Sequence, residues 1–377
     1  MKPRINPLPK NKLGLGIPYI TSDELTAAGR IIKSGWLSLG QETEKFEQAM
    51  AKYAGAKYAV ATNSGTAALH LSVIASGIKA GDEVITTPFT FVASTNCILY
   101  EKAKPIFADI DPATLNLDVK QIEAKITAKT KAILAVDVFG YPAEWQTIIK
   151  ICQKHNLAII EDAAEALGAK YQKKKLGSLN HLAVFGFFPN KQMTTGEGGI
   201  VTTNNKKQYE LMKRLANQGH RAGQDQQDYH YLGYNYRITE ISAALGNEQL
   251  KKIDWFLASR RQIAGWYDEQ LANIPGINLL KPNDPDHQRS WFVYVILLDK
   301  TINRRKIAAK LSRFGVPVKT YFPSLHLQPY LKSLNYQRGD FPVSEAVSQA
   351  TLALPFYTSM SQKTVISACN QLKEALK

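Results

Sequence analysis

The chain has 377 residues, of which 45% are hydrophobic and 21% are charged. This length allows a sizeable core and more than one domain, and the low charge with ordinary aromatic content excludes an intrinsically disordered chain. Three widely spaced cysteines exclude a disulfide framework and a four-cysteine metal or iron–sulfur site, so we expect no metal and a reducing, cytoplasmic setting. No window approaches the ~18 uninterrupted apolar residues that a membrane span needs.

The charge balance is strongly positive. The sequence has 47 Lys and Arg against 32 Asp and Glu, a formal net charge of +15. A positive field attracts polyanions, so nucleic acid, an acidic lipid surface and phosphorylated small molecules are all possible partners on charge alone.

Residues 22–53 have a helical pattern, in which Ser22 and Asp23 are placed to cap a first helix and FEQAM gives the apolar face of a second. Short apolar runs then alternate with amphipathic segments, which is typical of β-α-β units in a mostly parallel sheet. The expected strands are 58–62, 83–87, 105–110, 132–136, 157–163 and 200–204, and the expected helices are 67–78, 93–101 and 145–155.

A long helical run follows at 240–274, and after it we expect a smaller α+β region with an apolar run at 290–298, a helix at 304–314 and the segment 316–322. The sequence therefore predicts an α/β fold, with a mostly parallel sheet flanked by helices and a smaller C-terminal α+β domain. We place the boundary near Lys251, within the helical run, so that the domains are 1–250 and 251–377. No repeat period or low-complexity tract is visible.

The segment VFGFFPNKQMTTGEGG places Lys191 between aromatic residues and a glycine-rich turn. A lysine in such a setting can be partly desolvated, which lowers its pKa and gives the neutral amine that Schiff-base chemistry requires. On residue type alone, a solvated surface lysine is the commoner case. The neighbouring glycines favour the reactive interpretation, because they allow close backbone approach to a ligand.

In LAIIEDAAEALGA, an apolar strand runs directly into Glu161 and Asp162. A carboxylate at the carboxyl end of a buried parallel strand lies where open α/β sheets bind their ligands. The alternative is that it caps a helix formed by AAEALGA.

ATNSGTAALHL runs from a strand through a Ser-Gly-Thr turn into a helix. The backbone N–H groups at that helix start, with the hydroxyls of Ser64 and Thr66, form an anion site suited to phosphate, although a plain helix cap has the same composition. In TPFTFVASTN, Phe89 and Phe91 are core candidates, and one of them could instead stack on a flat ring. Together these segments supply the parts needed to hold pyridoxal phosphate: a cradle for its phosphate, an aromatic ring, a carboxylate at a strand end and a lysine.

The sequence resembles the DegT/DnrJ/StrS family of sugar aminotransferases, which are pyridoxal-phosphate enzymes of fold type I. The resemblance covers nearly the whole chain and rests on the ordered segments SGWLSLGQETEKFE, NSGTAALHL, GDEVITTPFTFVAST, IFADID, EDAAEALGA, PNKQMTTGEGG, LGYNYRITEISAALGNEQL and YFPSLHLQPYL.

The resemblance implies a role for each matching residue. Lys191 matches the lysine that binds the cofactor covalently and shuttles the proton, and Asp162 matches the partner of the pyridine nitrogen. The other cofactor-binding matches are Gly65 and Thr66 at the phosphate, Phe91 at the ring face, Glu165 beside the ring, and Asn235, which a second subunit contributes to the phosphate. The last match implies a homodimer with shared active sites.

The family further implies an amino donor, glutamate or glutamine, and a keto group on a nucleotide-linked deoxysugar, in the biosynthesis of cell-surface polysaccharide or related amino sugars. Residues in the segments that line the family's substrate cleft are Trp36, Ser38, Tyr321 and His326, and Arg221 and Arg237 could meet the diphosphate. The chain departs from the family at Gly186, where a serine commonly reaches the phosphate, and in VDVFGYP, which lacks a frequent histidine.

Three alternatives remain at the level of the sequence. A pyridoxal-phosphate sugar dehydratase would use histidine in place of Lys191 or add an iron–sulfur cluster, for which the cysteines are too few. An amino-acid-specific fold type I enzyme would need a strong arginine site for the substrate carboxylate, which the sequence does not reveal. A regulatory or nucleic-acid-binding protein would cluster its basic residues, yet the only triple run, 173–175, lies in an expected turn. We therefore expect no nucleic-acid or membrane partner.

Overall fold

The structure is a computed structural model that describes residues 2–5, 13–220 and 229–377. Its centre is a seven-stranded sheet with the strand order β1-β9-β8-β5-β4-β2-β3. The strands are β1 (Tyr58–Thr62), β2 (Glu83–Thr86), β3 (Lys104–Phe107), β4 (Thr130–Val136), β5 (Ala158–Asp162), β8 (Leu182–Gly186) and β9 (Gly199–Thr203). All neighbouring pairs from β3 to β8 are parallel, and β9 runs antiparallel to both β8 and β1.

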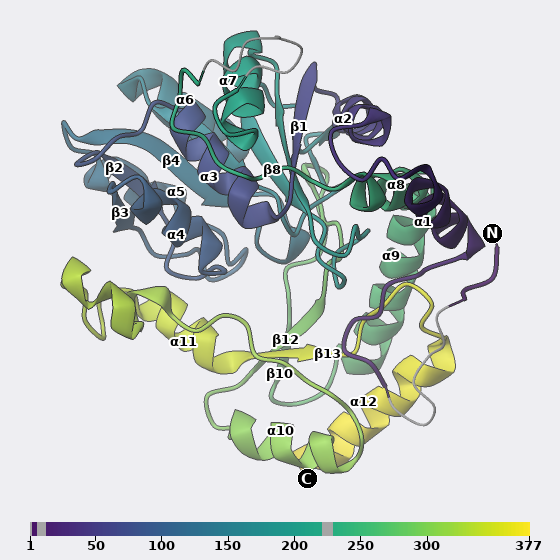
Figure 1. Ribbon diagram of the computed structural model, residues 1–377. Coiled ribbons are helices and arrows are strands. Elements are labelled where there is room, and N and C mark those ends of the chain that lie inside the picture. Colours follow the sequence, from purple (N-terminus) through teal and green to yellow (C-terminus); the bar gives the residue numbers. More distant parts are fainter. Residues whose placement is uncertain (1, 6–12, 221–228) are drawn as a thin grey trace.

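Both faces of this sheet are covered, as Figure 1 shows. Helices α3 (Gly65–Ala75), α4 (Ala93–Tyr100) and α7 (Lys206–Ala216) contribute to the apolar cluster on one face. Helices α2 (Gln41–Ala54) and α6 (Trp145–His155) contribute to the cluster on the other face. Along β4, Leu134 and Val136 belong to the first cluster and Ile133 and Ala135 to the second, as the alternation of a strand buried on both faces requires.

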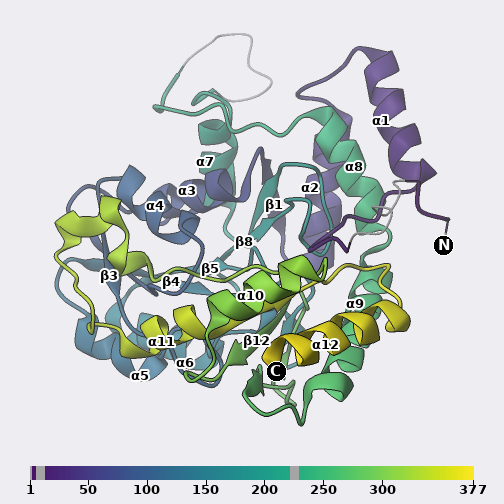
Figure 2. The same cartoon turned by 90° about the horizontal axis from the view of Figure 1, so that it is seen from below.

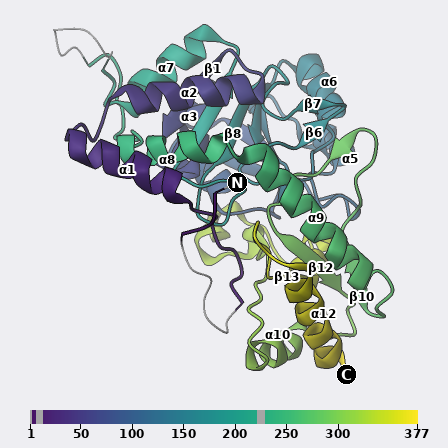
Figure 3. The ribbon, with the colours of Figure 1, turned by 90° about the vertical axis from the view of Figure 1, so that its right-hand side faces the viewer.

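The C-terminal part lies beneath the sheet in Figure 1 and is seen from below in Figure 2. Its three-stranded sheet has the order β10-β12-β13, and its buried apolar residues form a separate cluster. The elements are β10 (Ile277–Leu279), β12 (Tyr294–Leu298), α10 (Arg304–Arg313), α11 (Pro342–Ala350), β13 (Thr351–Leu354) and α12 (Gln362–Leu376). Figure 3 shows helix α9 (Ile253–Leu271) running from the large sheet into this part.

The remaining elements are short or lie at the edge of the fold. They are α5 (Val119–Ile122), the two-residue strands β6 (Lys170–Tyr171), β7 (Lys174–Lys175) and β11 (His287–Gln288), and the 3-10 turns η1 (Glu123–Lys125), η2 (Val138–Gly140), η3 (Leu325–Leu327) and η4 (Pro329–Leu334). The basic run 173–175 is part of the β6–β7 hairpin, in which Gln172 and Lys173 have positive φ.

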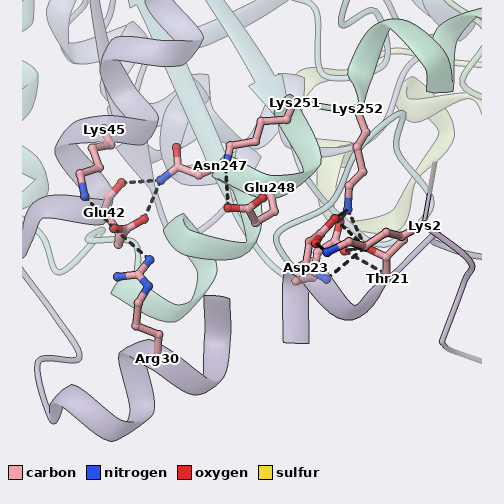
Figure 4. A network of polar contacts seen from close by, with 11 residues as sticks. Lys2, Thr21, Asp23, Arg30, Glu42, Lys45, Asn247, Glu248, Lys251 and Lys252 are labelled. Carbon is pink, nitrogen blue, oxygen red and sulfur yellow. Dashed lines mark hydrogen bonds and ion pairs between the residues drawn. The ribbon is translucent and has the colours of Figure 1, made fainter. Parts of the chain in front are cut away.

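Polar contacts hold the N-terminal helix α1 (Ser22–Ser34) and α2 against α8 (Glu240–Leu250). Arg30 and Lys45 pair with Glu42, which also accepts a hydrogen bond from Asn247 (Figure 4). A second group of contacts surrounds Lys252, which lies just before α9. Its ammonium donates to the Thr21 hydroxyl and to the Glu24 carboxylate. The N-terminal helices are thus fixed to α8 through side chains and through a short backbone bridge between Ser38 and Thr239.

The structure confirms the α/β architecture and corrects three local expectations. The cap of α1 is Thr21, not Ser22 or Asp23: its hydroxyl accepts from the Asp23 N–H while Glu24 accepts from the Thr21 N–H, a capping box. No helix follows Asp162, because the segment 163–168 forms successive turns. The helical run 240–274 is two helices, interrupted at residues 251–252.

Candidate active site

The polar residues singled out by the sequence gather at the carboxyl ends of β4, β5 and β8. Asp162 is the last residue of β5, and Lys191 lies in the loop between β8 and β9. Because the parallel strands end at the same edge of the sheet, this edge is the expected position of a ligand in an open α/β fold.

Asp162 is buried, with 5% of its surface exposed. One carboxylate oxygen accepts a hydrogen bond from the Ser94 hydroxyl at 2.6 Å, and the other accepts from the Ala164 N–H at 3.1 Å. Burial raises the pKa of this carboxyl above its ordinary value, and the bonds from Ser94 and Ala164 oppose the rise. A cation placed beside Asp162 would complete its stabilisation as a carboxylate.

Lys191 is largely, though not fully, removed from solvent, with 15% of its side-chain surface exposed, and its amine has few polar contacts. The nearest carboxylate atom to its Nζ is Glu165 Oε1 at 3.8 Å, and the Nζ lies 4.2 Å from the centre of the Phe292 ring. Burial lowers the pKa of Lys191, and the negative charges of Glu165 and Asp162 only partly oppose this. The surroundings therefore favour the neutral, nucleophilic form of the amine more than water does.

Glu165 is held by the turn that follows β4. Its Oε2 accepts a hydrogen bond from the Phe139 N–H at 3.0 Å, and the Gln192 amide donates to the Glu165 carbonyl oxygen at 2.6 Å. Phe139 has a φ of 51°, a conformation that is unusual for a bulky residue, and directs its N–H at the carboxylate. Burial raises the pKa of Glu165, and the charge of Lys191 opposes that rise.

The N-terminus of α3 forms an open anion cradle. The hydroxyl of the N-cap residue Ser64 accepts from the Ala67 N–H, while the N–H groups of Gly65 and Thr66 have no acceptor among the described residues. A Cβ atom on Gly199 would lie 2.5 Å from the Ser64 carbonyl oxygen, so only glycine permits this approach of β9 to the cradle. Two unpaired donors and a helix dipole suit a phosphate group.

Gly186 connects the cradle to the lysine. A Cβ on Gly65 would be 3.6 Å from the Gly186 Cα, and a Cβ on Gly186 would be 3.8 Å from the Lys191 Cε. The distances around a Cβ at position 186, of which the shortest is 3.5 Å to the Ala164 Cβ, are ordinary van der Waals contacts, so a Cβ atom fits there. The glycine found in place of the family's serine is therefore not required by packing.

Phe91 has 60% of its surface exposed, whereas Phe89 is fully buried in the core. Phe91 precedes α4, and its carbonyl oxygen accepts from the N–H of Ser94, the residue that binds Asp162. Of the two phenylalanines in this segment, Phe91 is the one available to cover a flat ring beside the carboxylate.

Residues 232–237 form an extended segment, called the strap below. Asn235 lies in it between two tyrosines whose rings face inward. Tyr234 and Tyr236 stack with ring centroids 4.9 Å apart, and the Tyr236 hydroxyl lies 3.0 Å from Nδ1 of the buried His70. The alternation of an extended chain directs the intervening Asn235 side chain to the opposite side, and this residue is exposed. Its backbone oxygen accepts from Asn63, one residue before the cap of the phosphate cradle.

The four expected substrate residues lie in different surroundings. Tyr321 is near Glu165, and its buried hydroxyl has no partner among the described residues. Ser38 forms an isolated bridge with Thr239, and Trp36, with 64% of its surface exposed, lies against Gly40 in the same loop. His326 has a fully buried side chain whose Nε2 lies 3.0 Å from Glu345 Oε1, a placement that does not support sugar contact.

The two arginines expected near a diphosphate differ in what the structure describes. Arg237 donates to the Asn217 side chain at 2.9 Å, and Arg221 lies outside the described residues.

Sequence reasoning missed Ser94, which binds Asp162 from a helix 68 positions away. Only its place one turn after Phe91 could have suggested it. Sequence reasoning also left Asp137 without a role: its carboxylate accepts from the Ala143 N–H and the Trp145 indole N–H, so it anchors the start of α6. Within the described ranges, no group of side chains is arranged to hold a metal ion, and no helix there is long and apolar enough to cross a membrane.

Comparison with known proteins gives a consistent family assignment. Residues 18–373 match the DegT/DnrJ/EryC1/StrS aminotransferase family. A GDP-perosamine synthase from Caulobacter vibrioides is 37% identical over 368 residues, which cover 96% of this chain and 98% of the relative. Related synthases from Escherichia coli O157:H7 and Vibrio cholerae are 36% and 34% identical.

Solved structures agree with these matches. PseC of Helicobacter pylori, an aminotransferase involved in the biosynthesis of pseudoaminic acid, superposes with a TM-score of 0.92 at 28% identity over 97% of this chain and 99% of that chain. A putative sugar aminotransferase from Streptococcus pneumoniae, solved in its PLP form, has a TM-score of 0.92 at 27% identity over 97% and 98% of the two chains. The chain therefore belongs to the DegT/DnrJ/EryC1/StrS family of pyridoxal-phosphate-dependent sugar aminotransferases, as its sequence motifs predicted.

Proposed function

We propose that this aminotransferase moves an amino group from glutamate or glutamine to the keto group of a nucleotide-linked deoxysugar, in the biosynthesis of cell-surface polysaccharide or a related amino sugar. The observation that carries the proposal is the largely buried, weakly paired amine of Lys191 near Asp162 and an open phosphate cradle. The substrate class is supported by the GDP-perosamine synthases, which match nearly the whole chain.

The residues present fit pyridoxal phosphate. The unpaired N–H groups of Gly65 and Thr66 would hold its phosphate, and the buried carboxylate of Asp162 would pair with its protonated ring nitrogen. Phe91 and Glu165 would lie beside the ring, and Lys191 would bind its aldehyde carbon. When bound, the cofactor supplies an electron sink that stabilises the negative charge left after the α-proton of the amino donor is removed.

Once the amine of the donor has replaced it at the aldehyde carbon, the freed Lys191 would act as the base and the acid of the reaction. Its Nζ takes the proton from the α-carbon of the donor and, in the return half of the cycle, delivers a proton to the carbon that carried the keto group of the sugar. Burial favours both roles, because the lowered pKa of Lys191 allows the amine to be neutral before it accepts a proton. Glu165, 3.8 Å away, stabilises the ammonium that forms.

For the sugar, we propose contacts from Tyr321, Trp36 and Ser38. The Tyr321 hydroxyl is a buried group without a partner among the described residues, which a sugar oxygen would satisfy. Trp36 exposes a large flat surface of the kind that stacks on sugar rings. The +15 charge of the chain would favour the approach of the substrate diphosphate.

We also propose a homodimer in which Asn235 reaches the cofactor phosphate of the partner subunit. The strap holds Tyr234 and Tyr236 against its own subunit and leaves Asn235 exposed. Large apolar side chains are exposed in the strap and in the loop before α2, and a second copy of the chain would bury them: Leu37, Leu39 and Leu232.

The test of the reaction is incubation of the purified enzyme with glutamate and a panel of keto-sugar nucleotides, followed by mass spectrometry and NMR of the sugar. We expect one or a few sugars to gain an amine while glutamate becomes the 2-oxo acid. A sugar that loses a hydroxyl without gaining nitrogen would show a dehydratase instead. If no keto-sugar nucleotide reacts and a free 2-oxo acid is aminated efficiently, the proposal is wrong.

The test of the shared site mixes two variants, Lys191→Ala and Asn235→Ala, each of which we expect to be nearly inactive. In a mixed dimer one site carries both changes and the other carries neither, so random exchange should restore about a quarter of the wild-type activity. If Asn235 serves its own subunit, mixing restores nothing.

A further inference from the structure

Arg260, in the first half of α9, is a buried cation that the proposed reaction does not use. Only 2% of its surface is exposed, and among the described residues it forms no ion pair with a carboxylate. Removal of a guanidinium from water is unfavourable unless other groups stabilise the charge. The contacts that Arg260 makes instead therefore indicate why it is there.

Those contacts converge on the reactive lysine. One terminal nitrogen of Arg260 donates to the carbonyl oxygen of Lys191 at 3.2 Å. The other donates to the carbonyl oxygen of Phe292 at 3.1 Å, and the ring of Phe292 lies 4.2 Å from the Lys191 Nζ. Arg260 thus binds both the main chain of the lysine and the residue whose ring faces its amine.

The guanidinium itself is fixed in orientation. It lies over the ring of Phe356, with its central carbon 5.4 Å from the ring centre. A planar fork of donors can bind carbonyl oxygens from two separate segments, whereas a lysine ammonium at this position would supply a point charge on a flexible stem.

We propose that Arg260 is a positioning residue for catalysis: it sets the place of the Lys191 amine by binding the Lys191 and Phe292 carbonyl groups from helix α9. This inference rests on the proposed role of Lys191 as the reactive amine. Because α9 runs from the large sheet into the C-terminal part, the contact also links the position of the lysine to the seating of that part on the sheet (Figure 3).

The charge of Arg260 is separate from its geometry. Burial lowers its pKa to about 10, which still leaves it a cation at neutral pH. The cation that disfavours the ammonium form of Lys191 is Lys319, so Arg260 acts on the lysine through its hydrogen bonds to the main chain.

Two substitutions separate geometry from charge. Arg260→Lys keeps the charge and loses the fork, whereas Arg260→Gln loses the charge and keeps one amide donor. The glutamine variant is expected to fold, because replacement of a buried charge by a neutral group is often tolerated.

Two further arginines on helices serve as matched controls. Arg261→Lys changes the exposed neighbour of Arg260 on the same helix. Arg304→Lys removes an arginine that donates to the Ser348 and Thr351 carbonyl oxygens in the C-terminal part, away from Lys191.

The decisive measurement uses the protein without cofactor. Brief acetylation at a series of pH values, quantified at Lys191 by mass spectrometry, gives the pH at which half of the amine is reactive. For Arg260→Gln we expect this midpoint to move upward by roughly half a unit or more, because an amine that is no longer held in place gains contact with water and its pKa rises. Both controls should keep the wild-type midpoint.

Steady-state kinetics of the loaded enzyme gives an independent readout. For Arg260→Lys we expect kcat to fall on the order of 10- to 100-fold, the effect of a small misplacement of a reacting group, with the KM for the sugar nearly unchanged. Arg304→Lys, by contrast, should lower the thermal midpoint of unfolding and leave kcat unchanged.

The inference is overturned if both Arg260 variants fold and retain the wild-type labelling midpoint and kcat. It is also overturned if Arg304→Lys shifts the Lys191 midpoint as much as Arg260→Gln does, since loss of stability alone would then explain the shift. Failure of the proposed function would look different: no keto-sugar nucleotide would be aminated by wild-type protein, whatever the labelling of Lys191.

Discussion

Two lysines that are largely removed from solvent have opposite surroundings in this protein. Lys252, at the junction of α8 and α9, places its Nζ 2.7 Å from both the Thr21 hydroxyl and Glu24 Oε1 and 3.4 Å from an oxygen of Asp23 (Figure 4). Lys191 has its nearest carboxylate oxygen at 3.8 Å and otherwise faces an aromatic ring.

This contrast separates an amine that holds the structure together from the amine that we propose to be reactive. Close oxygen acceptors bind an ammonium through charge-assisted hydrogen bonds, so Lys252 is suited to hold α1 against α8 and α9. At Lys191, burial without such acceptors lowers the pKa of the amine. The free N–H groups of the nearby α3 terminus fit the same pattern, because a binding site must leave some polar groups for its ligand.

The largest expected effect is that of Lys191→Ala. Loss of the amine removes the covalent attachment of the cofactor and the proton carrier, so turnover should fall by at least about a thousandfold. The checks are the visible absorbance of the purified protein and its transamination rate. A Lys191→Ala protein that keeps the wild-type absorbance band and turnover would contradict the role of this residue.

Lys252→Met should act on stability instead. It leaves the carboxylate of Glu24, only 1% exposed, without its cation, so the free energy of unfolding should fall by ~3–5 kcal/mol. Urea denaturation at one fixed subunit concentration measures this, with the exposed neighbour variant Lys251→Met as control. Folded Lys252→Met protein should retain its kcat, and a loss of kcat as large as that of Lys191→Ala would remove the distinction between the two lysines.

The ion pair between Lys252 and Glu24 also predicts how the stability of the protein depends on pH. Burial raises the pKa of Glu24, but the hydrogen bonds from Lys252 and Thr21 outweigh it, so the pKa in the folded protein lies below the ordinary value. The stabilisation by Glu24 is thus complete above an ordinary glutamate pKa of about 4.3 and is lost as the pH falls through the folded value. The difference in unfolding free energy between wild type and Lys252→Met should therefore shrink as the pH is lowered below about 4.3. A difference that is constant with pH would exclude this account.

Ser94→Ala should have a smaller effect, on chemistry rather than stability. It removes the 2.6 Å donor to Asp162, which raises the pKa of that carboxyl further and weakens its support of a protonated ring nitrogen. We expect turnover to fall about tenfold, in line with loss of a hydrogen bond to a charged group, and the acidic limb of the pH–rate profile to move to higher pH.

Thr95→Ala is the matched control for this change, because it removes a neighbouring buried hydroxyl that has no partner among the described residues. If Thr95→Ala moves the pH–rate profile as far as Ser94→Ala does, the bond to Asp162 has no special importance.

The sequence predicted the parts of this structure that depend on local pattern. Helix α6 has the predicted bounds, because its apolar face and its flanking residues lie within one stretch of chain. The alternative in which Asp162 caps a helix is wrong. Asp162 does accept from the Ala164 N–H as a cap would, but the chain continues as separate turns, closed by the Ala166 N–H on the Ala163 oxygen and the Ala169 N–H on the Ala166 oxygen.

In the candidate site, too, only the features that are local in the sequence could be predicted. Lys191 and Asp162 were found from residues beside them in the chain. The contacts of Ser94 with Asp162 and of Arg260 with Lys191 join segments 68 and 69 positions apart, so they depend on how α4 and α9 pack, and no local pattern contains that information.

The smallest expected effect tests the cradle at Gly186. A Cβ there would lie 3.5 Å from the Ala164 Cβ and 3.8 Å from the Lys191 Cε, so Gly186→Ser fits without displacing backbone. Its hydroxyl would add a donor beside the free N–H groups of α3, and we expect cofactor affinity to rise a few-fold, about the contribution of one further hydrogen bond. This affinity is measured by removing the cofactor by dialysis and then titrating the protein with free pyridoxal phosphate. Gly186→Ala is the control for added bulk without the hydroxyl. Equal affinities of the serine and alanine variants would show that a hydroxyl at position 186 adds nothing. The free N–H groups at the start of α3 would then be enough to bind the phosphate.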